Sequence, residues 1–245
     1  MLQQTRVERA IPFYRKFIKR FPTARRLASA PLASVLRSWQ GLGYNRRAKQ
    51  LHAAAKVVVR KKFPKSESIS KSSYRTKMIS DPVAKLEGLP GVGSYTARAI
   101  AAFAYNQDVI LIETNIRAAI IHHFFSRRSD VEDTELVEVL KRVLPRGKAR
   151  RWYGALMDYG ASLKRAGIPH NDRGRHYKKQ SKFAGSLREA RGAILRKLSF
   201  GSASPGELTG LFGHGRRPQM RTALRALCNE RLIEKRGENY TLARG

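Results

Sequence analysis

The chain has 245 residues, which suffices for one large domain or two smaller ones, and its 50 Lys and Arg against 18 Asp and Glu give a formal net charge of +32. This basic balance runs along the whole chain and indicates a polyanionic partner, with nucleic acid favoured over an anionic membrane surface or a ribosomal role. The sequence has no apolar run of the ~20 residues that span a bilayer, no signal peptide and only one cysteine, Cys228, so it predicts a cytoplasmic, nucleoid-associated protein without an internal disulfide.

Apolar residues at helical spacing dominate the first 60 residues. They predict helices from Thr5 to the FPT at 21–23, over 24–29, over 31–39 and after the GLGYN at 41–45. Residues 61–80 are rich in Ser and Lys and lack periodicity, which indicates an exposed loop.

Helical patterns return beyond this loop. They cover 82–88, 94–105, 115–125, 131–143 and 149–162, and only the DVILI at 108–112 looks extended. We therefore expect residues 1–162 to form one all-helical domain whose short connections contain Gly and Pro.

Residues 163–186 are basic and poor in apolar side chains, which indicates a linker. Three helices are then expected, in SLREARGAILRKLSF, SPGELTGLFG and RPQMRTALRALCNE, followed by two short strands around the turn at 237–239. This order is typical of a winged helix-turn-helix domain, which we place at 187–245. Its third helix, with Arg217 and Arg221, would supply the face that contacts the DNA groove.

Residues 88–100, GLPGVGSYTARAI, place three glycines and a proline, and no acidic residue, directly before or at the start of a helix. A helix N-terminus without acidic or bulky cover can bind an anion through its backbone N–H groups. The pattern predicts a hairpin that binds DNA phosphate, with an ordinary helix–helix turn as the alternative. The expected contact residues are Leu89, Gly91, Val92, Gly93, Ser94 and Thr96.

Six sequence blocks occur in a characteristic order: MLQQTRV, FPT, WQGLGYNRRAKQLH, LPGVGSYTARAI, IETNIRAAI and ALMDYGA. In order and approximate spacing they resemble the helix-hairpin-helix DNA glycosylases, most of all the mismatch-specific adenine glycosylases. The resemblance covers about residues 1–162. It implies an all-α fold and a base excision repair enzyme that flips a base out of duplex DNA and hydrolyses its N-glycosidic bond.

Such a reaction needs a carboxylate beside the sugar. The family has an Asp there, in a D-G-N pattern, and this chain has Glu113-Thr114-Asn115, so the resemblance implies that Glu113 is catalytic with Asn115 beside it. The alternative is that Glu113 merely stabilises a helix N-terminus. Bifunctional relatives carry an attacking Lys where this chain has Tyr95, which implies a monofunctional enzyme, unless Tyr95 is simply a core aromatic.

Three residues resemble family positions that wedge into the duplex: Gln3, Gln4 and Tyr44. Capping or core roles would explain them as well. Arg46 fits a phosphate contact or a solvated helix face, and Asp158 is expected in a cap or a helix–helix contact rather than in catalysis.

Two family features have no counterpart. The adenine glycosylases carry a catalytic Glu two residues before the MLQQT methionine, so either this sequence is truncated or the acid is missing. The family usually has four cysteines after the ALMDYGA helix, whereas 163–186 contains none, so we expect no iron–sulfur cluster and no other cofactor. A monovalent cation at the hairpin carbonyls is the one metal that the resemblance allows. Four histidines lack Cys or carboxylate neighbours at ligand spacing and are expected on the surface or facing DNA: His122, His123, His170 and His176.

These patterns predict a monomeric, monofunctional DNA glycosylase that acts on double-stranded DNA with a mispaired or damaged base, and that does not bind membranes. Adenine in A/G-type mispairs is the expected base. The alternatives are a uracil or thymine glycosylase, or a non-enzymatic DNA-binding regulator on a glycosylase scaffold. The combination of Glu113, Tyr95 and Asn115 argues against a regulator.

Overall fold

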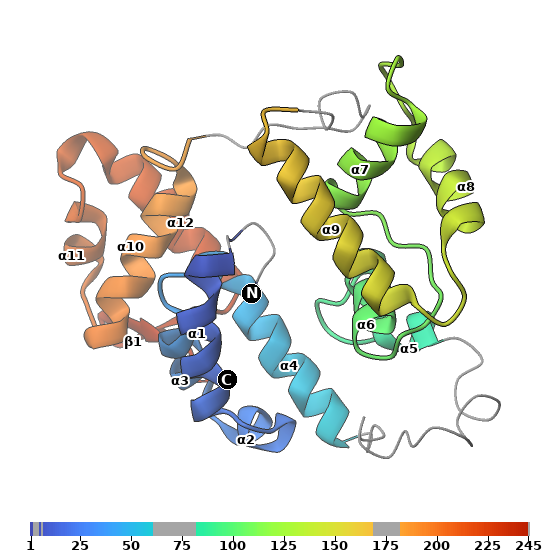
Figure 1. The fold of residues 1–245 in the computed structure, drawn as a ribbon. Coiled ribbons are helices and arrows are strands. Elements are labelled where there is room, and N and C mark those ends of the chain that lie inside the picture. Colours follow the sequence, from blue (N-terminus) through green and yellow to red (C-terminus); the bar gives the residue numbers. More distant parts are fainter. Residues whose placement is uncertain (2–4, 6, 61–81, 169–181, 245) are drawn as a thin grey trace. The chain divides into compact units, whose positions relative to one another are not determined.

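The computed structural model describes residues 1, 5, 7–60, 82–168 and 182–244 (Figure 1). The chain forms two compact units: unit 1 combines Met1–Phe63 with Ser181–Gly245, and unit 2 is Pro64–Gln180. The predicted loop at 61–80 and most of the predicted linker lie outside the described residues. None of the helices in the described ranges is long and apolar enough to cross a membrane.

Unit 1 begins with four helices at the positions that the periodicity predicts, drawn in blue to cyan in Figure 1. They are α1 (Val7–Arg20), α2 (Ala24–Ser29), α3 (Leu32–Trp39) and α4 (Arg46–Arg60). The FPT sequence separates α1 from α2 because the Thr23 hydroxyl accepts a hydrogen bond from the Arg26 N–H and caps α2.

Helix α1 buries a different face from the one that its most regular apolar spacing indicates. The buried residues are Ala10 and Phe17, and the Phe17 ring packs edge-on against Phe21 and Trp39. The regularly spaced apolar residues are exposed: Val7, Ile11, Tyr14 and Ile18. The helix thus has apolar residues on two faces. The face with Ala10 and Phe17 packs against the rest of unit 1, and the face with the four exposed residues does not.

The C-terminal part of unit 1 has winged helix-turn-helix topology, as predicted. Its elements are α10 (Leu187–Phe200), α11 (Pro205–Gly210), the 3-10 turn η3 (His214–Arg216), α12 (Arg217–Asn229), β1 (Ile233–Arg236) and β2 (Asn239–Leu242). The strands pair antiparallel with Ile233 opposite Leu242, and Ala203, between α10 and α11, makes a further bridge to Tyr240. The turn is shorter than predicted, because Asn239 already pairs with Arg236.

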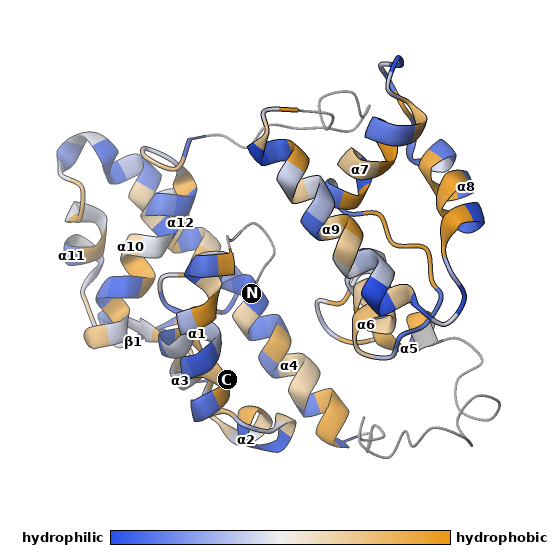
Figure 2. Ribbon diagram, in the orientation of Figure 1, coloured by the Kyte–Doolittle hydropathy of each residue, from blue (hydrophilic) through white to orange (hydrophobic). Residues whose placement is uncertain are grey.

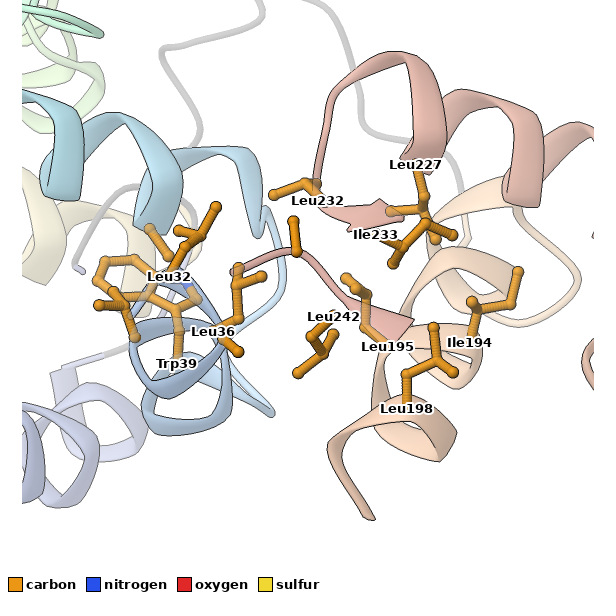
Figure 3. Packing of buried hydrophobic residues seen from close by; sticks show 14 of the residues in the cluster. Leu32, Leu36, Trp39, Ile194, Leu195, Leu198, Leu227, Leu232, Ile233 and Leu242 are labelled. Carbon is orange, nitrogen blue, oxygen red and sulfur yellow. The ribbon is translucent and has the colours of Figure 1, made fainter. Parts of the chain in front are cut away.

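The winged-helix elements share one hydrophobic core with the N-terminal helices (Figure 3). In Figure 3, Leu32, Leu36 and Trp39 of α3 lie on one side of Leu242, while α10 contributes the leucines on the other side. The Leu32 N–H also donates to the Arg244 carbonyl at 2.9 Å. This arrangement differs from the predicted domains at 1–162 and 187–245, because α3 contacts both α10 and β2 and shares one buried core with them.

All the named elements of unit 2 are helices, drawn in green and yellow in Figure 1. Its helices are α5 (Pro82–Glu87), α6 (Ser94–Phe103), α7 (Thr114–Phe124), α8 (Asp133–Val143) and α9 (Ala149–Arg165). Hydrophilic and hydrophobic residues share α8 and α9 (Figure 2), whose apolar faces form a core with α7. Helix α9 extends three residues beyond its predicted end, into the predicted linker, whereas 108–112 has no regular secondary structure.

Candidate active site

The hairpin between α5 and α6 turns its glycines and Ser94 outward. Gly91 has a φ of +77°, a left-handed conformation that favours glycine, and Gly93 is the N-cap of α6 without a side-chain cap. A Cβ at Gly93 would meet no atom within 4 Å, and the first turn of α6 has no acidic residue. The backbone here is therefore open to an anion, as the sequence predicts.

The apolar hairpin residues hold this turn in place. Leu89 and Val92 are half-buried and pack on a small core of Leu86, Ala97 and Ala101. The Val92 N–H closes the turn by donating to the Leu89 carbonyl at 3.0 Å. The Leu89 N–H likewise donates to the Leu86 carbonyl at 3.0 Å. The side chains of Leu89 and Val92 and their backbone N–H groups thus support the hairpin from within.

Glu113 caps the N-terminus of α7. Its Oε2 atom accepts a hydrogen bond from the Asn115 backbone N–H at 2.7 Å. The capping role, which the sequence offered as the alternative reading, is therefore real. The Oε1 atom has no hydrogen-bond partner among the described residues, and the side chain is only half-buried. One carboxylate oxygen fixes the helix, and the other can face a reactant.

Tyr95 lies in the first turn of α6 with 40% of its surface exposed, so it is not a core aromatic. Burial of part of the ring raises the pKa of its hydroxyl, and the negative charge of Glu113 raises this pKa further. An electrostatic influence of this kind requires the two groups to lie near each other. The Glu113 carboxylate at the start of α7 thus lies within electrostatic range of Tyr95 at the start of α6.

Helix α9 positions the segment that leads to Glu113, and the sequence pattern does not reveal this role. The fully buried Tyr153 hydroxyl accepts from the Leu111 N–H at 3.0 Å and donates to the Val109 carbonyl at 2.8 Å. Gly160 lies so close to α7 that an added Cβ would stand 2.0 Å from the Asn115 carbonyl oxygen. The only sequence signal for these contacts is the ALMDYGA block, which contains Gly160.

The other candidate residues of unit 2 show no comparable hydrogen bonds to the segment around Glu113 within the described residues. Asp158 lies exposed in the middle of α9, so the expected cap role is wrong. His123 stacks on Tyr159 with ring centroids 5.4 Å apart, beside His122. His, Cys, Asp and Glu side chains form no metal-binding group within the described ranges, which do not include His170 and His176.

The remaining DNA-contact candidates belong to unit 1. Tyr44 is exposed with a φ of +48°, and the Arg47 guanidinium lies 4.6 Å from its ring centroid. Arg46 is exposed at the start of α4, and Arg217 and Arg221 are exposed on α12. Gln3 and Gln4 lie outside the described residues. The structure thus gathers Glu113, Tyr95, Asn115 and the hairpin in unit 2, and the other described candidates in unit 1.

An all-helical unit with an open Gly-rich hairpin and a carboxylate at the next helix N-terminus defines a class, the helix-hairpin-helix base excision DNA repair proteins. Residues 1–145 match the model of the HhH-GPD superfamily base excision DNA repair proteins, and the chain belongs to this family.

Curated relatives carry the name adenine DNA glycosylase. The protein of Mycolicibacterium smegmatis is 33% identical over 219 residues, which cover 81% of this chain and 69% of that protein. The protein of Mycobacterium tuberculosis is 36% identical over 69% of this chain and 52% of its own length, and one from Buchnera aphidicola is 35% identical over 66% and 43%. The chain thus spans about half to two thirds of the length of these relatives. The comparisons confirm the predicted family, the HhH-GPD base excision DNA repair proteins, and the curated relatives within it are adenine DNA glycosylases.

The residues of this chain do not fit the iron–sulfur cluster that the family resemblance suggests. A four-cysteine cluster needs four thiolates, and the sequence contains only Cys228. This cysteine is half-buried on α12 against the core of unit 1, and burial raises the pKa of its thiol. Cys228 therefore behaves as a small apolar side chain.

Proposed function

We propose that this chain is a monofunctional adenine DNA glycosylase that removes adenine from A/G-type mispairs in double-stranded DNA. The observation that carries the proposal is the Glu113 carboxylate, held by the α7 N-terminus and close to Tyr95, with Oε1 available. The names of the relatives support adenine as the base. The protein would work as a monomer without a metal cluster.

The steps follow from the chemistry of these residues. The hairpin amides hold a phosphate of the duplex while the base leaves the stack. As the N-glycosidic bond breaks, positive charge develops on the sugar, and the Glu113 carboxylate stabilises it and orients a water molecule. Water adds to the sugar carbon, the water proton and the bonding electron pair end on the departing base, and an abasic site remains.

Tyr95 determines the fate of that abasic site. A bifunctional enzyme needs a lysine amine to form a covalent imine with the sugar, whereas the phenol of Tyr95 has no nitrogen and cannot form one. We expect strands to break only after alkali or heat. Borohydride treatment during the reaction should trap no enzyme–DNA adduct on a denaturing gel, and an adduct in good yield would contradict the monofunctional assignment.

Glu113→Gln tests the carboxylate directly. The substitution keeps the size of the side chain and its ability to cap α7 but removes the charge that matters in the transition state. We expect the single-turnover excision rate to fall by about 10²–10⁴, on the order of 3–5 kcal/mol, with duplex binding unchanged or tighter. Glu113→Asp restores the family residue and should retain measurable excision.

Two further variants test whether the loss of excision is specific to the Glu113 carboxylate. Glu138→Gln removes an equally negative charge from an exposed ion pair with Lys141 on α8 and should leave the rate unchanged. Asp158→Asn tests the one carboxylate of α9, which is exposed. If Glu113→Gln retains near-normal excision while Asp158→Asn does not, the catalytic carboxylate is misassigned. The excision assay uses a panel of duplexes that carry A, U or T in mispairs. The duplexes in which a strand breaks after alkali then show which base the protein excises.

A further inference from the structure

Helix α12 presents a row of arginines on the side that faces away from its core. Met220, Ala223, Leu224 and Leu227 are buried against unit 1. Arg217, Arg221 and Arg225 follow each other at four-residue spacing and are all exposed. Residues at this spacing lie on one face of a helix, one turn apart. The helix has no Asp or Glu along its length, so nothing on α12 itself neutralises the row, which we call the arginine stripe.

The acidic residues of the neighbouring elements form ion pairs with basic residues outside the stripe. Glu189 pairs with Arg216 at 2.8 Å, Glu230 with Arg191 at 2.6 Å, and Glu207 with Lys197 at 3.5 Å. Arg216 also lies over the Phe212 ring. These pairs fix arginines inside the module, whereas the three arginines of the stripe make no ion pair or hydrogen bond with any residue that the structure describes. The positive charge of the stripe is therefore available to a partner.

The surface around the stripe is open. A groove of about 390 Å³ between α11 and α12 is lined by Pro205, Gly206, Thr209, Arg217, Arg221 and Leu224. The N-terminal helices of unit 1 contact α10 and β2 through α3, and α4 reaches the C-terminal end of α12, where Lys49 donates to the Glu230 carbonyl. None of the residues that line the groove belongs to these helices. Helix α12 is also the third helix of the winged helix-turn-helix, the element that such domains place against DNA.

We propose that the arginine stripe is a second duplex-binding surface, which contacts the phosphate backbone of DNA irrespective of any mispair. Unpaired guanidinium groups at one-turn intervals, on a helix without Asp or Glu, match a row of phosphates in charge and in hydrogen-bond donors. This surface adds affinity for intact DNA and takes no part in base excision. The proposal does not rest on the glycosylase activity of unit 2.

The test replaces all three arginines by glutamine in the full chain and measures binding to a fully paired duplex at several salt concentrations. Each lost phosphate contact lowers the slope of log affinity against log salt by ~0.9. We expect the slope to become shallower by roughly 2–3 and the affinity at low salt to fall by about tenfold or more. Because the three side chains are exposed and unpaired, we expect the glutamine variant to remain folded. An unaltered thermal transition checks this.

A charge-matched control is available on α1, where Arg15, Lys16 and Lys19 are also exposed. Replacing these three by glutamine changes the net charge equally and should alter the slope much less. An equal effect of both triple variants, or no effect of the α12 variant, overturns the proposal. Replacement of the stripe by three lysines should restore the slope, since it restores the charge. A loss that lysine does not rescue would also overturn a phosphate-binding role.

Excision under single-turnover conditions with saturating enzyme separates this proposal from the catalytic one. The glutamine stripe variant should excise at the normal rate once bound, whereas Glu113→Gln should bind and not excise. Failure of excision in the unaltered protein would refute the proposed function and leave the salt-slope result intact.

Discussion

At the scale of single residues, two residues of α9 position the carboxylate of Glu113, which we propose to be catalytic. Tyr153 connects to the backbone of the segment before Glu113 through two hydrogen bonds, and both groups would be left unpaired and buried without it. Gly160 removes the atoms that would keep α9 away from the first turn of α7. The candidate site thus depends on one hydroxyl and on one absent methyl group.

Gly160→Ala should therefore disturb the candidate site, although residue 160 is not one of the candidate site residues. The new methyl group would overlap the Asn115 carbonyl, which belongs to the backbone and cannot rotate away, so we expect a loss of about 1–3 kcal/mol in the free energy of unfolding. The excision rate should fall as the α7 N-terminus moves. Denaturant unfolding and single-turnover kinetics measure the two effects.

Gly154→Ala is the matched control on the same helix, since a Cβ there meets nothing within 4 Å. It should stabilise α9 by about 0.5–1 kcal/mol, because alanine loses less backbone entropy than glycine in a helix. If both substitutions have the same effect, the close contact between α9 and α7 is not what holds the site.

At the scale of elements, local chemistry is sufficient to place the helices. Thr23, Glu113, Ser186 and Ser204 each cap a helix with a side-chain oxygen, and each stands where the periodic pattern of the following helix begins. The face that a helix buries is a different matter. Helix α1 has apolar residues on two sides, and only the position of Trp39 and Phe21 decides that Phe17 points inward.

At the scale of the whole molecule, the winged-helix module is part of unit 1 and not an appended domain. Leu36 of α3 is 3% exposed and lies in the core that also contains Leu195 and Leu198 of α10. Removing 187–245 would expose this apolar surface, so a truncated chain is expected to lose the N-terminal helices as well. The C-terminal module, although its sequence pattern differs from that of the N-terminal helices, is thus expected to be required for the folding of those helices.

Leu36→Ala tests the shared core. We expect a loss of about 2–5 kcal/mol in the free energy of unfolding, as for other buried leucines. Backbone amides of α3 and of α10 should lose hydrogen-exchange protection together. Leu136→Ala makes the same truncation in the core of unit 2 and serves for comparison. Protection of α10 that survives Leu36→Ala would mean that the C-terminal module folds independently.

The sequence by itself determined the helical class, the helix positions, the open hairpin and the family, because caps, periodicity and glycine positions act within a few residues of each other. It also indicated Glu113 and Tyr95, through their places in the family blocks. Only the tertiary structure decided that Tyr153 and Gly160 hold the backbone on either side of Glu113, and that α3 and α10 share a core. These features join residues that are 42 to 162 positions apart. Such pairs meet because buried surface and hydrogen bonds are satisfied across helices, and no local pattern in the sequence records which distant partner satisfies them.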